Sequence, residues 1–309
     1  VIQFEDLRKE AAVDTGLADR TGVYRDNPRA LVVTIQGLMP NLTPAERAIA
    51  EVVLELRNQS AGDVRLAHVA GAAGVSQAAV VKFAQRLGLH GFRDLRDILL
   101  AYRSVVGAEL HEELALSDDP ETVVRKVFHT ATQALTDTLA IFDYAAFDRA
   151  AGALAGAERR LLVGVGGSAT IAHDFEHKLL RIGIPARAHD DTHLMAMTAS
   201  LLGRGDVALG ISHSGATVAV LEALELAAGQ GATTIGITNT PESELARVVD
   251  VALLSASQGS PITGENAASR VAQLNILDAL FVRVAQVHAD RSQANLEATM
   301  RSVTRKRLR

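Results

Sequence analysis

The sequence predicts an α/β fold, with a five-stranded parallel sheet flanked by helices and an all-α domain ahead of it. Three observations support this prediction. From residue 159 onward short apolar runs alternate with helical patterns, the runs lack polar alternation, and the segments before residue 159 show mainly helical periodicity. The runs are 161–165, 184–188, 207–211, 233–238 and 251–254. Strands of this kind are buried on both faces, as in a parallel sheet wrapped by helices, where ligands lie beyond the carboxyl ends of the strands.

Composition and charge limit the classes of protein that the chain can belong to. Its 309 residues suffice for two domains, and its net charge is −5. Basic residues outnumber acidic ones in 41–103 and 301–309, which suits a surface that partly meets nucleic acid, although solvated helix faces give the same pattern. There is no cysteine, no signal-peptide pattern and no apolar run near the ~18 residues of a membrane span. We therefore expect a cytoplasmic protein without disulfides or Cys-based zinc sites.

Residues 66–85 have the pattern of a helix-turn-helix. Gly74 suits the left-handed turn between two short helices that cross closely. Small or apolar residues occupy the positions where such helices pack, namely Val69, Ala70, Ala73, Val75, Val80 and Phe83. A plain helical hairpin with a glycine cap fits the same residues and remains an alternative at this point.

In a helix-turn-helix the second helix enters the major groove with its N-terminal end toward the bases. Gln77 is then the expected base reader, because glutamine pairs bidentately with adenine. Ser76, which also caps the helix, is expected to hold phosphates together with Lys82 and Arg86. The predicted DNA-binding residues are Ser76, Gln77, Ala78, Lys82 and Arg86.

Changes of periodicity divide the chain into five segments. Thr43, Pro44 and Glu46 predict a capped helix start in the second of them. A break at 116–120 opens a long helix whose apolar stripe fits a linker, a dimer contact or internal packing. The segments are an N-terminal extension (1–30), the helix-turn-helix domain (31–106), a helical linker (107–155), the α/β domain (156–290) and a basic tail (291–309).

Residues 212–217 form a run of small hydroxyl residues bent around a glycine, between the apolar run 207–211 and a helical pattern. The first N–H groups of a helix lack intrahelical partners and the helix dipole is positive there, so a phosphate is favoured. Ser212, Ser214 and Thr217 would add hydroxyl donors. The alternative is that Ser214 or Thr217 merely caps the helix. Three hydroxyls around one glycine, with a similar turn upstream, favour a ligand site.

The upstream turn, residues 164–169, ends the first predicted strand and opens another helix. This turn is a poor match to the glycine-rich loop that binds dinucleotides. The third conserved position of that loop is glycine or, in its loosest form, alanine, and here it is Ala169. His173 and His177 lie four residues apart on one helix, but no third metal ligand is evident. Residues 189–193 also resemble a cluster of metal ligands, but we interpret their side chains as mostly solvated, with one of them near a bound ligand. We therefore predict neither a cofactor nor a metal.

Several of these segments together carry a resemblance to a known family. They are 75–83 with 87–92, 164–168, 178–183, 212–217, Glu265 and 269–270. Over roughly residues 31–290 the chain resembles an RpiR-type transcriptional regulator, in which a helix-turn-helix precedes a flavodoxin-like sugar isomerase (SIS) domain. The resemblance implies a phosphosugar pocket, dimers or tetramers formed through the SIS domain, and DNA affinity that changes when the sugar phosphate binds. The implied ligand-binding residues are Gly167, Ser168, Ser212, His213, Ser214, Gly215, Thr217 and Glu265.

Two features depart from the pattern of that family, one in the second helix of the helix-turn-helix and one in the ligand loop. Ala79 and Lys82 stand where threonine and arginine are common, so phosphate contacts of the second helix would be weaker. His213 stands between the serines of the ligand loop, where it would strengthen phosphate binding if protonated or donate to the sugar if neutral.

Two functions are compatible with this sequence. The first is a DNA-binding regulator of sugar metabolism that senses a phosphorylated sugar and binds a double-stranded operator. The second is a phosphosugar isomerase or lyase that uses Glu265 or a histidine as its base. Residues 66–85 favour the regulator, because an isomerase has no use for a helix-turn-helix. We therefore expect a non-enzymatic homo-oligomer without a membrane contact.

Overall fold

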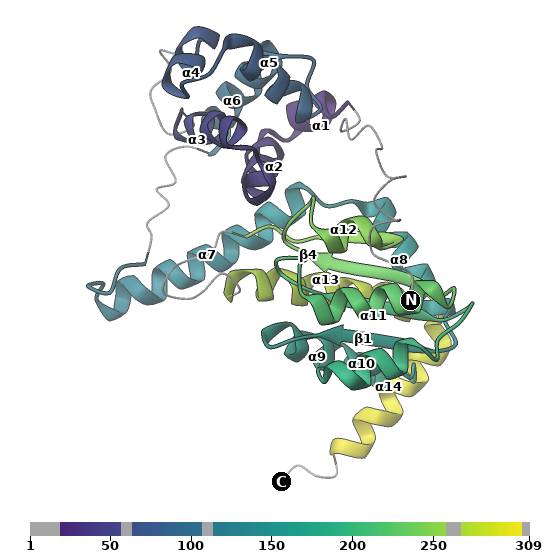
Figure 1. The fold of residues 1–309 in the computed structure, drawn as a ribbon. Helices are drawn as coiled ribbons and strands as arrows, with labels where there is room; N and C mark the ends of the chain where they lie inside the picture. Colours follow the sequence, from purple (N-terminus) through teal and green to yellow (C-terminus); the bar gives the residue numbers. More distant parts are fainter. Residues whose placement is uncertain (1–18, 57–63, 107–113, 258–266, 305–309) are drawn as a thin grey trace. The chain divides into compact units, whose positions relative to one another are not determined.

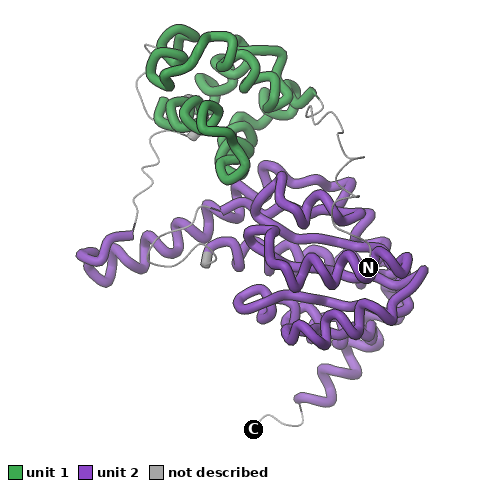
Figure 2. The backbone as a smooth tube through the Cα atoms, viewed as in Figure 1, with its two compact units in different colours: residues 1–110 green, residues 111–309 purple. Residues whose placement is uncertain are grey.

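The computed structural model describes residues 19–56, 64–106, 114–257 and 267–304. The chain divides into two compact units, residues 1–110 and 111–309 (Figures 1 and 2). Within the described residues no single helix is long and apolar enough to cross a membrane. One bent pair of helices, Leu66–Ala72 with Gln77–Arg86, meets the length and composition of a membrane span only when the two are taken together.

The first unit is all-helical and is built around a core of aliphatic side chains that includes Leu31, Ile35, Ile49 and Leu99. Its elements are α1 (Thr21–Asp26), α2 (Pro28–Leu38), the 3₁₀ turn η1 (Met39–Asn41), α3 (Pro44–Leu56), α4 (Leu66–Ala72), α5 (Gln77–Arg86) and α6 (Phe92–Val106). The predicted capped start of α3 is confirmed. The Thr43 backbone N–H and hydroxyl both donate to Glu46 Oε2, at 3.0 and 2.7 Å.

Part of the predicted N-terminal extension is an integral piece of this unit. In α1, Tyr24 is buried, and Arg25 on the same helix donates to Asp94 of α6 at 2.8 Å. The Arg20 backbone N–H donates to the Gly88 carbonyl at 2.9 Å. The short α1 packs in this way because one aromatic side chain reaches the core while its charged neighbours bond across the surface.

The second unit is a five-stranded parallel sheet in the order β2-β1-β3-β4-β5, covered by helices on both faces (Figure 1). This confirms the predicted flavodoxin-like α/β fold. Its elements are α7 (Pro120–Ala140), α8 (Tyr144–Gly156), β1 (Arg160–Gly164), α9 (Gly167–Arg181), β2 (Arg187–His189), α10 (Thr192–Ala199), β3 (Val207–Ile211), α11 (Val218–Gly229), β4 (Thr233–Thr238), α12 (Glu244–Val248), β5 (Val251–Leu254), α13 (Ala267–Val287) and α14 (Ala289–Thr304).

The two faces of the sheet carry separate cores, and alternate residues of β1 and β3 contribute to both. On one face Leu162, Leu209 and Ile237 pack with buried residues of α8, α9 and α13. On the other face Leu161 and Val163 pack with residues of α10, α11 and α12. Continuous apolar runs therefore form these strands because both faces of the sheet are covered.

Two paired glycines let the second helical layer approach the sheet. Gly210 and Gly236 are partners in the β3–β4 register. A methyl group on Gly210 would stand 2.6 Å from Leu224 Cδ1, and one on Gly236 would stand 2.5 Å from Leu245 Cδ2. A glycine is needed at both positions because the helices α11 and α12 pack directly on the backbone there.

The predicted second strand, 184–188, is shifted toward its C-terminal end in the structure. Only Arg187–His189 pair with β1, although Ile184 is buried. Pro185 has no backbone N–H to give to the sheet, so the first part of the run serves the core without joining the ladder.

The helices that flank the sheet unit are packed against it. Ala150 and Leu154 of α8 are fully buried in the core, and Ala134 of α7 packs against α13. In α14, Asn295 Nδ2 donates to the Ile182 carbonyl at 2.9 Å. Ala134 lies outside the apolar stripe predicted for residues 120–139, most of which is exposed, namely Val123, Val124, Val127, Phe128 and Leu139. The helix α14 binds the end of α9 rather than forming a separate tail.

Candidate functional site

The sequence-predicted ligand loops meet at the point where the strand order of the sheet reverses. β1 and β3 are neighbours and end together, with Gly164 opposite Ile211. The helices that follow them leave toward opposite faces, α9 to one and α11 to the other. Such a switch point opens a crevice beyond the strand ends, where α/β proteins bind ligands.

The β1–α9 turn brings the backbone close to itself and to the start of a helix. A methyl group on Gly164 would stand 2.8 Å from the backbone carbon and oxygen of Ser168. Gly166 has φ +60° and ψ −123°, a conformation that only glycine adopts readily, and it occupies the N-cap position of α9 without a side-chain cap. The first turn of α9 is thus left without the side-chain acceptor that usually caps a helix.

The β3–α11 turn is held together by hydrogen bonds among its own hydroxyl groups. Ser212, which is buried, places its Oγ 2.8 Å from Thr217 Oγ1 and accepts from the Gly215 N–H at 3.1 Å. Ser214 is exposed and accepts from the Ala216 N–H at 3.3 Å. Thr217 is the N-cap residue of α11, but its side chain makes no capping bond. The capping interpretation of Ser214 and Thr217 is therefore wrong, and both helices of the crevice start without a side-chain cap.

The loop after β4 supports this turn from beneath. Thr238 Oγ1 and the Asn239 N–H both donate to the His213 carbonyl, at 3.1 and 3.0 Å. Gly215 has φ +66°, and a methyl group there would stand 2.1 Å from Ser243 Oγ. The conformation of residues 212–217 thus depends on residues in and after β4 that carry no local sequence signal for a site.

Arg270 is a further residue of this region that the predicted ligand set lacks. It belongs to the first turns of α13, and its side chain lies against Gly167 at the start of α9. Residues 269–270 belong to the segments that carry the family resemblance, but a lone arginine in a helical pattern looks like a solvated charge, so no ligand role is predicted for it. Glu265, the predicted acidic member of the site, lies outside the described residues.

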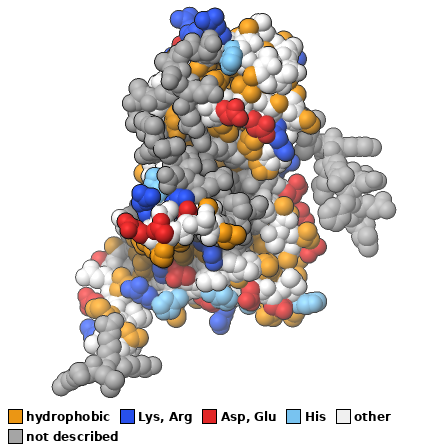
Figure 3. All heavy atoms as spheres, turned by 90° about the vertical axis from the view of Figure 1, so that its left-hand side faces the viewer, with side chains coloured by type: hydrophobic (Ala, Val, Ile, Leu, Met, Phe, Trp, Pro, Cys, Tyr) orange, Lys and Arg blue, Asp and Glu red, His pale blue; other side chains and the backbone are white. Residues whose placement is uncertain are grey.

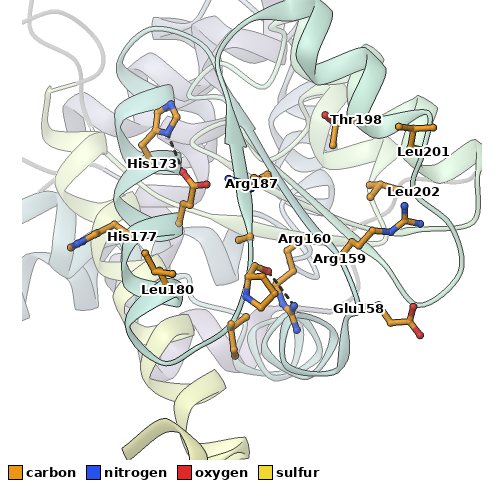
Figure 4. A pocket seen from close by; sticks show the side chains of 14 residues that line it. Glu158, Arg159, Arg160, His173, His177, Leu180, Arg187, Thr198, Leu201 and Leu202 are labelled. Carbon is orange, nitrogen blue, oxygen red and sulfur yellow. Dashed lines mark hydrogen bonds and ion pairs between the residues drawn. The ribbon is translucent and has the colours of Figure 1, made fainter. Parts of the chain in front are cut away.

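A cavity of about 580 Å³ lies apart from these turns, along the edge strand β2 between α9 and α10 (Figure 4). Its lining includes His173 and His177 on α9 and Arg187 on β2, and none of the predicted ligand residues. His173 Nδ1 lies 3.4 Å from Glu176 Oε2. In the part of the chain that the structure describes, no three His, Asp or Glu side chains gather as a metal site.

The predicted packing of the helix-turn-helix is confirmed. The helices α4 and α5 are bent by 100°, and the turn residue Gly74 has φ +65°. The Ser76 side chain caps α5 by accepting from the Ala79 N–H at 3.2 Å. Four residues of the predicted packing set are buried between the helices, namely Val69, Ala70, Val80 and Phe83.

The residues predicted to contact DNA divide into two groups. Ser76, Gln77, Ala78 and Lys82 are exposed on α5. Arg86 instead donates from Nη1 to Glu46 Oε2 of α3 at 2.6 Å, and both side chains are about three-quarters buried. Burial disfavours the Glu46 carboxylate, but hydrogen bonds from Arg86 and Thr43 outweigh it and lower the pKa of Glu46. In this structure Arg86 thus joins α5 to α3, which the sequence did not indicate.

Charged side chains are distributed unevenly over the first unit. Figure 3 shows a group of Lys and Arg side chains at the top of this unit in that view, above a surface where hydrophobic and acidic groups are mixed. A basic patch on a helix-turn-helix unit can bind the phosphate backbone of nucleic acid.

A helix-turn-helix unit followed by an α/β unit whose two glycine-bent turns meet at the switch point of the sheet is typical of one class of protein, the transcriptional regulators that carry a ligand-binding domain. Two family models match the chain accordingly, "Helix-turn-helix domain, rpiR family" at residues 30–104 and "SIS domain" at residues 153–283. The chain is 40% identical to the HTH-type transcriptional regulator RpiR of Escherichia coli K12 over 258 residues, which are 84% of this chain and 87% of that protein. It therefore belongs to the RpiR family of transcriptional regulators.

Other proteins support the same assignment. An uncharacterised HTH-type transcriptional regulator of Caldanaerobacter subterraneus subsp. tengcongensis is 34% identical over 83% of this chain and 90% of its own length. Among solved structures, the Vibrio vulnificus NanR protein complexed with ManNAc-6P matches with a TM-score of 0.57 and 25% identity, covering 90% of this chain and all of that one. The sugar isomerase domain of an RpiR transcription factor from Sphaerobacter thermophilus matches with a TM-score of 0.54 and 25% identity, covering 58% of this chain and 99% of that one.

Proposed function

We propose that this regulator senses a phosphorylated sugar at the crevice between the β1–α9 and β3–α11 turns, and that the sugar phosphate changes its affinity for an operator. The observation that carries the proposal is the convergence of two uncapped helix N-termini at the switch point of the sheet. A phosphate accepts hydrogen bonds from backbone N–H groups at such positions.

The hydroxyl groups of the two turns complete the proposed site. Ser168 is half-buried at the start of α9, and Ser214 is exposed at the mouth of the second turn. Ser212 and Thr217 are bonded to each other, so we assign them to shaping the loop as well as to the ligand. NanR, which matches nearly the whole chain, was solved with a sugar phosphate, and this supports the same chemical class of ligand here.

A thermal-shift screen tests the ligand class. Aldose and ketose phosphates, ManNAc-6P among them, are compared with the same sugars without the phosphate. A ligand that binds only the folded state raises the melting temperature, by an amount set by its concentration relative to Kd. We expect a rise for at least one phosphorylated sugar and none for its unphosphorylated form. If no phosphorylated sugar raises the melting temperature, the proposed site is not a phosphosugar sensor.

Operator titrations test the coupling between ligand and DNA. An effector that changes the affinity for DNA by some factor must have its own affinity changed by DNA by the same factor. Ser214→Ala should weaken binding of the sugar phosphate while leaving basal DNA affinity unchanged, because its exposed hydroxyl bonds only within its own turn. Equal loss of both affinities would contradict a division of labour between the two units.

An isomerase or lyase that acts on the same ligand is the alternative function. It would need a general base that moves a proton next to the sugar carbonyl. The relatives with the higher sequence identity are named transcriptional regulators, which favours regulation without turnover. Incubation of the ligand from the screen with the protein, followed by chromatography, would reveal aldose–ketose interconversion if the alternative holds.

We also propose that the chain works as a dimer or tetramer. The helix α7 leaves several apolar side chains exposed within the described chain, among them Val124 and Phe128 at 57% and 72%. An apolar face of this kind suits contact with a second copy. Phe128→Glu should then lower the mass measured by light scattering after gel filtration, whereas a monomeric wild type would contradict the proposal.

A further inference from the structure

The predicted ligand set contains no permanent positive charge, which would strengthen the binding of a phosphate. A phosphate monoester carries a charge of roughly −1.5 to −2 near neutral pH. The predicted ligands are glycines, neutral hydroxyl residues, one histidine and one glutamate, and none of them is permanently positive. Backbone N–H groups and hydroxyls can bind a phosphate, but charge-assisted hydrogen bonds are about twice as strong as neutral ones. A fixed cation close to the two turns would supply them.

Arg270 stands at the required place. A methyl group on Gly167 would lie 3.3 Å from Arg270 Cδ, 3.7 Å from Nη1 and 3.8 Å from Nε. The guanidinium thus lies beside the first residue of α9, the helix whose N-cap is Gly166. Gly167 leaves room for this arrangement, because any larger side chain would press on the arginine.

The Arg270 guanidinium is also available for a ligand. Its side chain is exposed, and it makes no hydrogen bond or ion pair with the portion of the chain that the structure describes. Other arginines of this unit are engaged, since Arg159 bonds Asp206 at 2.6 Å and Arg283 bonds Asp148 at 2.9 Å. The positive charge of Arg270 is therefore not neutralised by any carboxylate among the residues that the structure describes.

The neighbour of Arg270 provides an independent observation. Ser269 is fully buried, and its hydroxyl has no hydrogen-bond partner within the described chain. An unsatisfied buried hydroxyl is unfavourable, so such groups usually bond a ligand, a water or another part of the chain. Two unpartnered polar side chains thus follow each other in the first turn of α13, and the second of them, Arg270, lies against the start of α9.

We propose that Arg270 is the cationic ligand of the phosphate group in the sugar-phosphate site, reaching from α13 across Gly167 to the N-terminus of α9. This proposal rests on the proposed function and adds its charged contact. The planar guanidinium can bind two phosphate oxygens at once, so lysine is an imperfect substitute. It also ties α13 to the ligand, together with the two turns.

The test measures the binding of inorganic phosphate and of ManNAc-6P to the wild type and to four variants of the full chain at constant ionic strength. Arg270→Gln removes the positive charge. Arg270→Lys keeps the charge but lacks the planar guanidinium that can bind two phosphate oxygens at once. Ser214→Ala probes the pocket separately. Arg181→Gln is the matched control, because it removes an exposed arginine from the opposite end of α9. Melting curves without phosphate check that each variant folds.

If the proposal holds, Arg270→Gln weakens binding of the phosphorylated ligands by about tenfold or more, Arg270→Lys recovers part of that loss, and Arg181→Gln behaves as the wild type. If Ser214→Ala weakens binding but Arg270→Gln does not, the pocket stands and the role of Arg270 is overturned. If the wild type binds neither inorganic phosphate nor ManNAc-6P, and no other phosphorylated sugar raises its melting temperature, both the role of Arg270 and the proposed function fall.

Discussion

The Thr138 hydroxyl of α7 exchanges two hydrogen bonds with the backbone of Ala256, just beyond the end of β5. It accepts from the Ala256 N–H at 2.9 Å and donates to the Ala256 carbonyl at 3.3 Å, and both residues are buried. The neighbouring Ser257 bonds Asn239 of the loop after β4, whose backbone supports His213. A chain of hydrogen bonds thus runs from α7 to the candidate ligand turn.

Thr138→Val should therefore destabilise the protein. The isosteric valine removes the hydroxyl and leaves the Ala256 N–H and carbonyl buried without partners, which costs about 1–3 kcal/mol. Urea unfolding measures the change. The matched control is Thr132→Val on the same helix, where the exposed hydroxyl bonds only the carbonyl of its own helix, that of Phe128, at 3.0 Å. Equal effects of the two variants would show that the Ala256 bonds contribute nothing.

Gly215→Ala should disrupt the ligand turn. The residue has φ +66°, and the added methyl group would stand 2.1 Å from Ser243 Oγ. Backbone strain and overpacking together predict a loss of about 2–5 kcal/mol in the free energy of unfolding, with loss of sugar-phosphate binding. Gly229→Ala at the end of α11 meets no atom within 4 Å and should be neutral or stabilising by up to about 1 kcal/mol. Wild-type binding by Gly215→Ala would remove this turn from the site.

Lys82→Gln and Arg86→Gln should affect DNA binding differently. Lys82 is exposed on α5, so its loss should weaken all DNA sequences alike and reduce the slope of log K against log salt by about 1. Arg86 is paired with Glu46, so its replacement should instead cost about 1–3 kcal/mol of stability and leave the slope nearly unchanged. Titrations at several salt concentrations, with urea unfolding, separate the two. Equal slope changes would show that Arg86 leaves Glu46 to bind DNA.

Asp206 should make stability depend on pH on the acid side. Burial disfavours its carboxylate, but hydrogen bonds from Arg159 and the Gly203 N–H outweigh this and lower the pKa of Asp206 below the usual 3.8. Because the folded-state pKa is the lower one, the stabilisation is complete above the unfolded value and is lost as pH falls below about 4. Asp206→Asn should therefore be less stable at pH 7 and lose less stability on acidification.

Urea unfolding from pH 7 to pH 3 measures this effect. Asp190→Asn, a change of an exposed aspartate, serves as the control and should follow the wild-type curve. Parallel curves for Asp206→Asn and the wild type would contradict the role given to Asp206.

Much of the fold follows from local patterns. The strands at 207–211, 233–238 and 251–254 have the predicted bounds, because each is a continuous apolar run that only a doubly covered sheet can bury. The helix-turn-helix was predictable for a similar reason, since Gly74 and its packing neighbours have fixed offsets along the chain. The second strand begins later than predicted. The apolar Ile184 indicates burial, but pairing with the sheet requires a backbone N–H, which Pro185 lacks.

The candidate site was predictable only in part. The sequence placed residues 166–168 and 212–217 together, because parallel strands end at the same edge of a sheet. Helix capping by Ser214 or Thr217 is an alternative that fits the same sequence. The hydrogen bonds of the structure exclude this alternative, and no residue pattern predicts those bonds. The sequence also does not indicate the bond between Arg86 and Glu46, because Glu46 lies forty residues away in the chain.

The sequence by itself thus determined the class of each unit, the order of the elements and the two glycine-bent turns, since all of these depend on neighbouring residues. Tertiary structure decided which side chains share a surface. It set Arg270 against Gly167, Thr138 against Ala256 and Arg86 against Glu46. Each pair is separated by tens of residues or more, and such contacts arise from the packing of whole helices rather than from any local preference of the chain.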